Sequence, residues 1–82
     1  MYRAYTTRYA GPTDTRGARV IARSVKGTKA YPWHHEIDSY ANHEGAARAA
    51  ARSHGLDLRT ENEDVPSAAL PDGSGYVFLF AV

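Results

Sequence analysis

Apolar and polar residues alternate along the first part of the chain in the way that is typical of β-strands. Aromatic and β-branched residues recur over 2–9 and predict a first strand. A second strand is predicted over 18–25, and the loop around Gly27 predicts a hairpin to a third strand at 29–33. Pro32 lacks a backbone N–H, so we expect the third strand to lie at a sheet edge or to end early.

The middle of the chain changes to the period of an amphipathic helix. Asn42 is the candidate N-cap, and Glu44 falls in the first turn, where the helix dipole favours an anion. The helix is predicted to run to about His54, because Gly55 is well placed to end it. The inner face of this helix is built from small side chains. It consists of Ala46, Ala50 and Ser53, flanked by His43, Ala47 and His54. We expect the helix backbone to lie close over a sheet whose aromatic residues fill the space.

The last part of the chain predicts a polar connection followed by one strongly apolar strand. The segment 59–69 contains the run Glu61-Asn62-Glu63-Asp64, which predicts an acidic loop. Residues 76–80 are apolar on both faces, which is typical of a central strand covered on both sides or half-covered by another chain. Phe78 and Phe80 are therefore expected in the core.

These elements predict a single small α+β domain over residues 1–82. We expect a four-stranded, largely antiparallel sheet with one helix packed on one face, in the order β-β-β-α-β. Fourteen alanines add little buried area, so nine aromatic residues must supply much of the core. One helix covers only one face of such a sheet. The connection at 57–75 or a second copy must close the other face, and we expect a homodimer.

The sequence lacks several features that are typical of secreted, disulfide-bonded or membrane proteins. It has no cysteine, so disulfides and thiolate-metal sites are excluded. Its first residues are charged and alternating, without the apolar segment of a secretory signal. No apolar run approaches the ~20 residues that a membrane span requires. We therefore expect a cytoplasmic location, in a bacterial cell or the host of a phage.

Charge divides the chain into a basic front and an acidic back. Residues 1–30 carry seven cations and one anion, whereas residues 31–82 carry three cations and eight anions. Two neighbouring basic strands would form a ribbon that contacts nucleic-acid phosphates. The candidate nucleic-acid-binding residues are Arg8, Arg16, Arg19, Arg23, Lys26 and Lys29. Two other interpretations stay open: charges that protect an exposed strand edge from aggregation, and attraction of an acidic protein.

Tyrosines of the first predicted strand suggest a second kind of nucleic-acid contact. Tyr5 and Tyr9 share a face with Arg3 and Thr7 in an extended strand. Aromatic rings interleaved with cations on a sheet can stack on bases. The same strand is therefore a candidate for base contacts as well as phosphate contacts.

Two short motifs resemble those of a known group of proteins. The first is Tyr9-Ala10-Gly11-Pro12-Thr13-Asp14-Thr15-Arg16-Gly17-Ala18-Arg19-Val20, and the second is Leu70-Pro71-Asp72-Gly73 before the aromatic strand. They resemble a group of short uncharacterised proteins of bacteria, plasmids and bacteriophages. These have a strand, a GPTNTRG-like loop, a basic strand and an alanine-rich helix. Asp14 stands where Asn is expected. The resemblance implies one compact domain in a mobile-element setting, and it implies no chemistry.

The polar residues around the helix start do not match a catalytic or metal motif. They are His34, His35, Glu36, Asp38 and His43. They lack HExxH or a comparable fixed spacing, and no nucleophile is partnered with them. The loop from Gly11 to Gly17 lacks the GK[ST] of a phosphate-binding loop and leads into a strand instead of a helix. We therefore expect a non-enzymatic protein with no catalytic residues, no metal and no cofactor.

The sequence supports two hypotheses about function. The first is a small binding module, encoded by a phage or plasmid, that binds DNA or RNA through the basic ribbon. The second is a protein-binding factor that modulates or inhibits a host bacterial protein and docks through an exposed strand edge by β-augmentation. Neither hypothesis involves a membrane.

Overall fold

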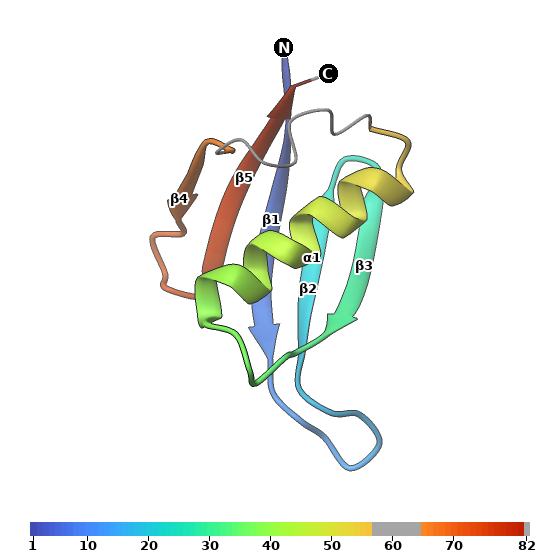
Figure 1. Cartoon of the computed structure of the whole chain (residues 1–82), viewed down its shortest axis with the longest axis vertical. Helices are drawn as coiled ribbons and strands as arrows, with labels where there is room; N and C mark the ends of the chain where they lie inside the picture. The colour runs from blue at the N-terminus through green and yellow to red at the C-terminus, as the bar shows by residue number, and fades with distance from the viewer. Residues whose placement is uncertain (57–64, 82) are drawn as a thin grey trace.

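A five-stranded antiparallel sheet with one helix across one face forms the computed structural model, which describes residues 1–56 and 65–81 (Figure 1). The elements are β1 (Tyr2–Ala10), β2 (Arg19–Ser24), β3 (Gly27–Pro32), α1 (Ser39–Ser53), β4 (Ser67–Ala69) and β5 (Gly75–Ala81). The strands lie in the order β3-β2-β1-β5-β4, so β1 is central. The predicted α+β class is confirmed. No helix in the described part of the chain is long and apolar enough to cross a membrane.

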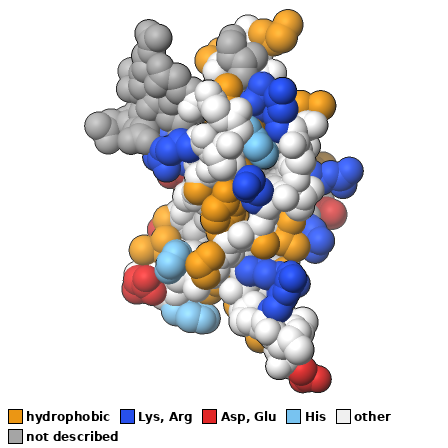
Figure 2. Space-filling view, turned by 90° about the vertical axis from the view of Figure 1, so that its right-hand side faces the viewer, with side chains coloured by type: hydrophobic (Ala, Val, Ile, Leu, Met, Phe, Trp, Pro, Cys, Tyr) orange, Lys and Arg blue, Asp and Glu red, His pale blue; other side chains and the backbone are white. Residues whose placement is uncertain are grey.

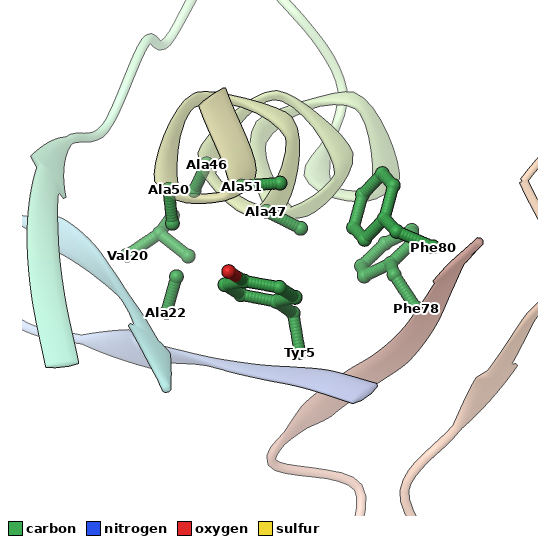
Figure 3. Packing of buried hydrophobic residues seen from close by; sticks show 9 residues of the cluster. All are labelled: Tyr5, Val20, Ala22, Ala46, Ala47, Ala50, Ala51, Phe78 and Phe80. Atoms are coloured by element: carbon green, nitrogen blue, oxygen red, sulfur yellow. The ribbon is translucent and has the colours of Figure 1, made fainter. Parts of the chain in front are cut away.

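The core lies between α1 and one face of the sheet (Figure 3). Rings from β1 and β5 point up from the sheet, and alanines from α1 point down towards them. The buried hydrophobic residues are Tyr5, Val20, Ala22, Ala46, Ala47, Ala50, Ala51, Phe78 and Phe80. Small alanine side chains let the helix backbone approach the sheet, and the rings fill the remaining space. The predicted core positions of Phe78 and Phe80 are confirmed.

Two hydrogen bonds between side chains fix the direction of α1 across the sheet. Thr7 Oγ1 and His43 Nδ1 are hydrogen-bonded at 2.7 Å near the start of the helix. The Tyr5 hydroxyl and His54 Nδ1 are hydrogen-bonded at 2.8 Å at its end. A buried polar group without a partner costs roughly 1–3 kcal/mol. A helix placed in another direction would lose both bonds, so the pair selects one docking orientation.

The helix begins earlier than predicted, and Asn42 is not its N-cap. Asp38 is the N-cap, and its side chain accepts a hydrogen bond from a backbone N–H of the first turn at 2.7 Å. Asn42 is buried, and its side chain bonds to both the N–H and the carbonyl oxygen of His34. Glu44 therefore lies beyond the first turn, where it pairs with Arg48 at 3.4 Å. The N-cap prediction was wrong because a tertiary contact of Asn42 replaced the local capping role.

The β2–β3 hairpin turns in two residues. Ser24 pairs with Gly27 across a turn made by Val25 and Lys26. Gly27 opens β3 with a φ of +131°, a conformation that other residues rarely adopt. The strand β3 lies at one edge of the sheet, as Pro32 predicted.

The fifth strand was not predicted. Ser67–Ala69 falls inside the segment 59–69 that predicts an acidic loop, yet it pairs with β5 as an edge strand. Two of its three residues are alanines, which have weak strand propensity, so pairing with β5 decides the conformation. Residues 59–64 of that segment, which include the acidic run, lie outside the described residues. Only α1 covers β5, on one face, and no other described element covers the opposite face.

Substitution by alanine should have opposite effects on stability at Gly45 and at Gly75. A Cβ at Gly75 would overlap the carbonyl oxygen of Thr7 on β1, whereas a Cβ at Gly45 would meet nothing within 4 Å. Because Gly weakens a helix interior, Gly45→Ala should raise the free energy of unfolding by about 0.5–1 kcal/mol. Gly75→Ala should lower it by about 2 kcal/mol or more, because β1 and β5 must separate. Urea denaturation measures both changes, and effects of the same sign would contradict the packing described here.

His43 links the stability of the fold to pH. Its ring is buried between α1 and the sheet, and burial lowers the pKa of His43 below the usual 6.5. The unfolded chain therefore binds a proton at His43 at a higher pH than the folded chain does. The stability that neutral His43 contributes is fully present above about pH 6.5. It is lost as the pH falls from there towards the folded-state pKa.

We expect the temperature of the unfolding midpoint to decrease when the pH is lowered from about 7.5 to about 5. In the His43→Gln variant this decrease should be much smaller. Gln keeps a polar group that can hydrogen-bond to Thr7 but does not titrate. The matched control is His35→Gln at an exposed position, which should leave the pH dependence unchanged. Identical pH profiles for the two variants would contradict the role of His43.

Candidate nucleic-acid interface

The open face of the sheet, defined as the face opposite α1, collects arginines from two strands. Side chains alternate between the two faces along each strand. Thr7 and Val20 are buried and therefore point towards α1. Arg8, Arg19 and Arg23 have the opposite parity, so all three belong to the open face.

Strand pairing places these arginines around one apolar residue. Arg8 of β1 lies directly opposite Ile21 of β2, and Ile21 lies between Arg19 and Arg23 on the same face. Both arginines of β2 are thus diagonal neighbours of Arg8, a separation of typically ~7–8 Å between backbones. We call Arg8, Arg19 and Arg23 the arginine triangle. Their long side chains can reach neighbouring phosphates of one polyanion together.

No negative charge balances the arginine triangle within the described residues. Close contacts between a basic and an acidic side chain join His34 to Glu36 and Arg48 to Glu44 within the described residues, and neither contact involves the triangle. The strand positions that belong to the open face, as far as the structure describes them, include no Asp or Glu. The open face therefore carries concentrated positive charge, which attracts anions.

Arg19 differs from the other two arginines of the triangle in the burial of its guanidinium group. Its Nε and Nη1 atoms are buried and have no hydrogen-bond partner among the described residues. A buried donor without a partner costs roughly 1–3 kcal/mol. Because both atoms are buried, an anion on the open face can accept from them only if the Arg19 side chain moves. Arg3 Nη1, on the helix side of β1, is buried and unpartnered in the same way.

Two hollows of the open face border the arginine triangle. One of about 330 Å³ is lined by Arg8 and Arg23 together with threonines of β1 and β3. The other, of about 410 Å³, is lined by Arg16 and Arg19, by the small residues just before β2, and by Ala30, Tyr31 and Pro32 of β3. Figure 2 looks onto the β3 edge and shows Lys and Arg side chains spaced along its length. Arginines thus line two separate hollows, one next to the 11–17 loop and one near the middle of the sheet.

The structure divides the predicted basic ribbon between different surfaces. Arg16 lies in the loop before β2, where it lines a hollow with Arg19. Lys26 lies in the hairpin turn. Lys29 pairs with buried Ala22, so it belongs to the helix side of the sheet. Four of the six candidates therefore border the open face, and the two lysines do not.

The predicted stacking of bases on Tyr5 is wrong. Tyr5 is 0% exposed beneath α1. Tyr9 is half-exposed but belongs to the helix side, where its ring meets Trp33 edge-to-face at 4.8 Å. Among the strands that the structure describes, Tyr2 is the one aromatic residue with open-face parity, and it lies at the far end of β1. The open face thus offers guanidinium groups and very little ring surface.

Neighbours of the arginines were not found by sequence reasoning. Thr6 and Thr28 flank Arg23 on the open face, on β1 and β3. Ile21 fills the centre of the arginine triangle. The period of two assigns each residue to one side of its own strand, but only the register shows which strands lie beside it.

The polar residues around the helix start have structural roles. His34 pairs with Glu36 at 3.4 Å on the surface, and Asp38 caps α1. His43 points into the core, away from the others. Within residues 1–56 and 65–81, no group of three His, Asp or Glu side chains converges as metal ligands do.

A scan against protein-family models and searches of curated proteins and of solved structures found no match to this chain. The chemistry of the open face must therefore be inferred from its own residues. Those residues supply guanidinium groups, threonines and small apolar side chains. Guanidinium groups and threonine hydroxyls are chemically suited to contacts with phosphates and other anions.

Replacing Arg19 tests whether its buried, unpartnered donors lower the free energy of unfolding. Met keeps an unbranched apolar side chain and removes the unpaired donors, so Arg19→Met should raise the free energy of unfolding by about 1 kcal/mol. The control Arg8→Met changes an exposed arginine of the same face and should alter stability by less than about 0.5 kcal/mol. Urea denaturation measures both variants. A clear loss of stability in Arg19→Met would show that its donors are already satisfied in solution.

Proposed function

We propose that this protein is a non-enzymatic module that binds the phosphate backbone of nucleic acids through the open face of its sheet. The observation that carries the proposal is the arginine triangle. Three arginines from two strands share one face, and none of them has an ionic partner among the described residues. A polyanion with closely spaced phosphates matches this arrangement better than a single small anion does.

Arginine chemistry and the scarcity of rings favour backbone contacts over base contacts. The planar guanidinium matches phosphate geometry and is weakly hydrated, so it favours phosphate binding. Base recognition by a sheet usually requires aromatic rings on its exposed face. Tyr5, Phe78 and Phe80 are instead buried under α1. We therefore expect binding that depends weakly on the base sequence.

Charge also limits how two copies can associate. An isologous contact through the open face would bring two arginine triangles together, and like charges at close range repel. The homodimer that the composition predicts would therefore use another surface. Both triangles would then stay free for nucleic acid.

Fluorescence anisotropy with a labelled DNA duplex of about 20 base pairs, over a series of salt concentrations, tests the proposal. Three phosphate contacts predict a log–log slope of the binding constant against salt of about −3. Arg8→Gln combined with Arg23→Gln should reduce the size of this slope by about 2 and weaken binding at least tenfold. A second duplex of unrelated sequence should bind with similar affinity.

The matched control removes the same charge from the other surfaces. Lys26→Gln combined with Lys29→Gln changes the hairpin turn and the helix side and should weaken binding far less than the arginine pair does. If both double variants lost the same affinity for the duplex, binding would depend on the net charge of the protein and not on the open face. Absence of binding by the wild-type protein at low salt would exclude the proposed function.

A further inference from the structure

A second surface lies between the helix side of β3 and α1. A hollow of about 220 Å³ opens there between β3 and the first half of α1. Its apolar lining comes from Tyr31, Pro32, Ile37, Ala41, Ala46 and Ala49. Figure 2 shows hydrophobic side chains gathered in the middle of this edge of the molecule. The hollow is smaller than the ~300 Å³ or more of small-molecule sites, which suits one inserted side chain.

The backbone of β3 offers hydrogen bonds directly beside this hollow. Ser24 and Gly27 close the two-residue turn as a hydrogen-bonded pair, and such pairs then alternate along the hairpin. Thr28 and Ala30 therefore point their N–H and C=O groups away from β2, towards the edge. No described residue accepts from or donates to these groups. An added strand can pair with both residues, up to Pro32, which has no N–H to offer.

Charge on the helix side of β3 defines what the added strand should carry. Lys29 and Tyr31 alternate with the edge-facing residues and belong to the side on which the hollow opens. Lys29 forms no ion pair with a described residue, and no Asp or Glu lines the hollow. In an antiparallel partner, a residue opposite Tyr31 is followed two positions later by a residue opposite Lys29. An apolar side chain at the first position and an acidic one at the second match this surface.

We propose that the groove between β3 and α1 binds an extended acidic peptide segment of another protein as a sixth strand antiparallel to β3. Backbone hydrogen bonds to Thr28 and Ala30 hold the segment. Its apolar side chain fills the hollow, and a carboxylate two residues later pairs with Lys29. This mode of recognition is β-augmentation. It uses a different surface from the arginine triangle and does not depend on nucleic-acid binding.

Gly45 supports the proposal from the helix side. It lines the hollow, and a Cβ added to it would meet nothing within 4 Å. No contact of the described fold therefore requires glycine here, although glycine weakens a helix interior by roughly 1 kcal/mol relative to alanine. A large side chain at this position would extend into the hollow. Glycine thus keeps the groove open at a cost to the helix.

The test uses ¹⁵N-labelled protein titrated with the peptide Ser-Thr-Leu-Thr-Glu-Thr-Ser and followed by NMR. We expect chemical-shift changes confined to β3 and the first half of α1. Replacing Leu by Ser or Glu by Lys in the peptide should weaken binding at least tenfold. Lys29→Glu should reverse the preference, so that the peptide with Lys binds better than the peptide with Glu.

Two variants at Gly45 distinguish a blocked groove from an unfolded protein as the cause of lost peptide binding. Gly45→Leu fills the hollow and should abolish peptide binding while its thermal unfolding midpoint stays at or above that of the wild type. Gly45→Ala leaves most of the hollow open and should keep binding. Shift changes on the open face, no shift changes at millimolar peptide, or unchanged binding by Gly45→Leu would each overturn the proposal. Duplex DNA binding should be the same in Gly45→Leu as in the wild type, so the two proposals can fail separately.

Discussion

The close packing of α1 against one face of the sheet is the constraint on which the rest of this structure depends. A chain this short has few large side chains, and its alanine-lined helix can pack well only if the sheet supplies the volume. Tyr5, Phe78 and Phe80 meet that need, and all three point to the same side. The strand register is then fixed, because a slip by one residue would turn these rings to solvent.

This one-sided core determines the character of the open face. Along β1 and β5, every second position faces α1, and apart from Tyr2 the residues between them are small, aliphatic, hydroxyl-bearing or charged. The same alternation along β2 buries Val20 and Ala22 and turns Arg19 and Arg23 outwards. Register with β1 then adds Arg8 to them. Positive charge accumulates on the open face as a consequence of how the core is built.

Unpaired arginines weaken a small fold, and the core must offset that cost. The buried donors of Arg19 and the mutual repulsion of three guanidinium groups both oppose folding. Proteins commonly keep such locally unfavourable features where they bind something. The groove beside β3 shows the same pattern in another form, because Gly45 weakens the helix while the hollow stays open. The two surfaces meet at β3, where Tyr31 and Pro32 line both the groove and the hollow beside Arg19.

The sequence by itself determined the α+β class, the helix end at His54 and Gly55, the edge position of β3 and the buried rings of β5. These features follow from local periodicity and from residues with strong backbone preferences, which act within a few positions. Only the tertiary structure decided the burial of Tyr5, the role of Asn42, the strand β4 and the grouping of Arg8 with Arg19 and Arg23. Each of these depends on which segment lies beside which, and on the face that α1 covers. Alternation within one strand assigns a residue to a side, but long-range pairing decides what that side faces.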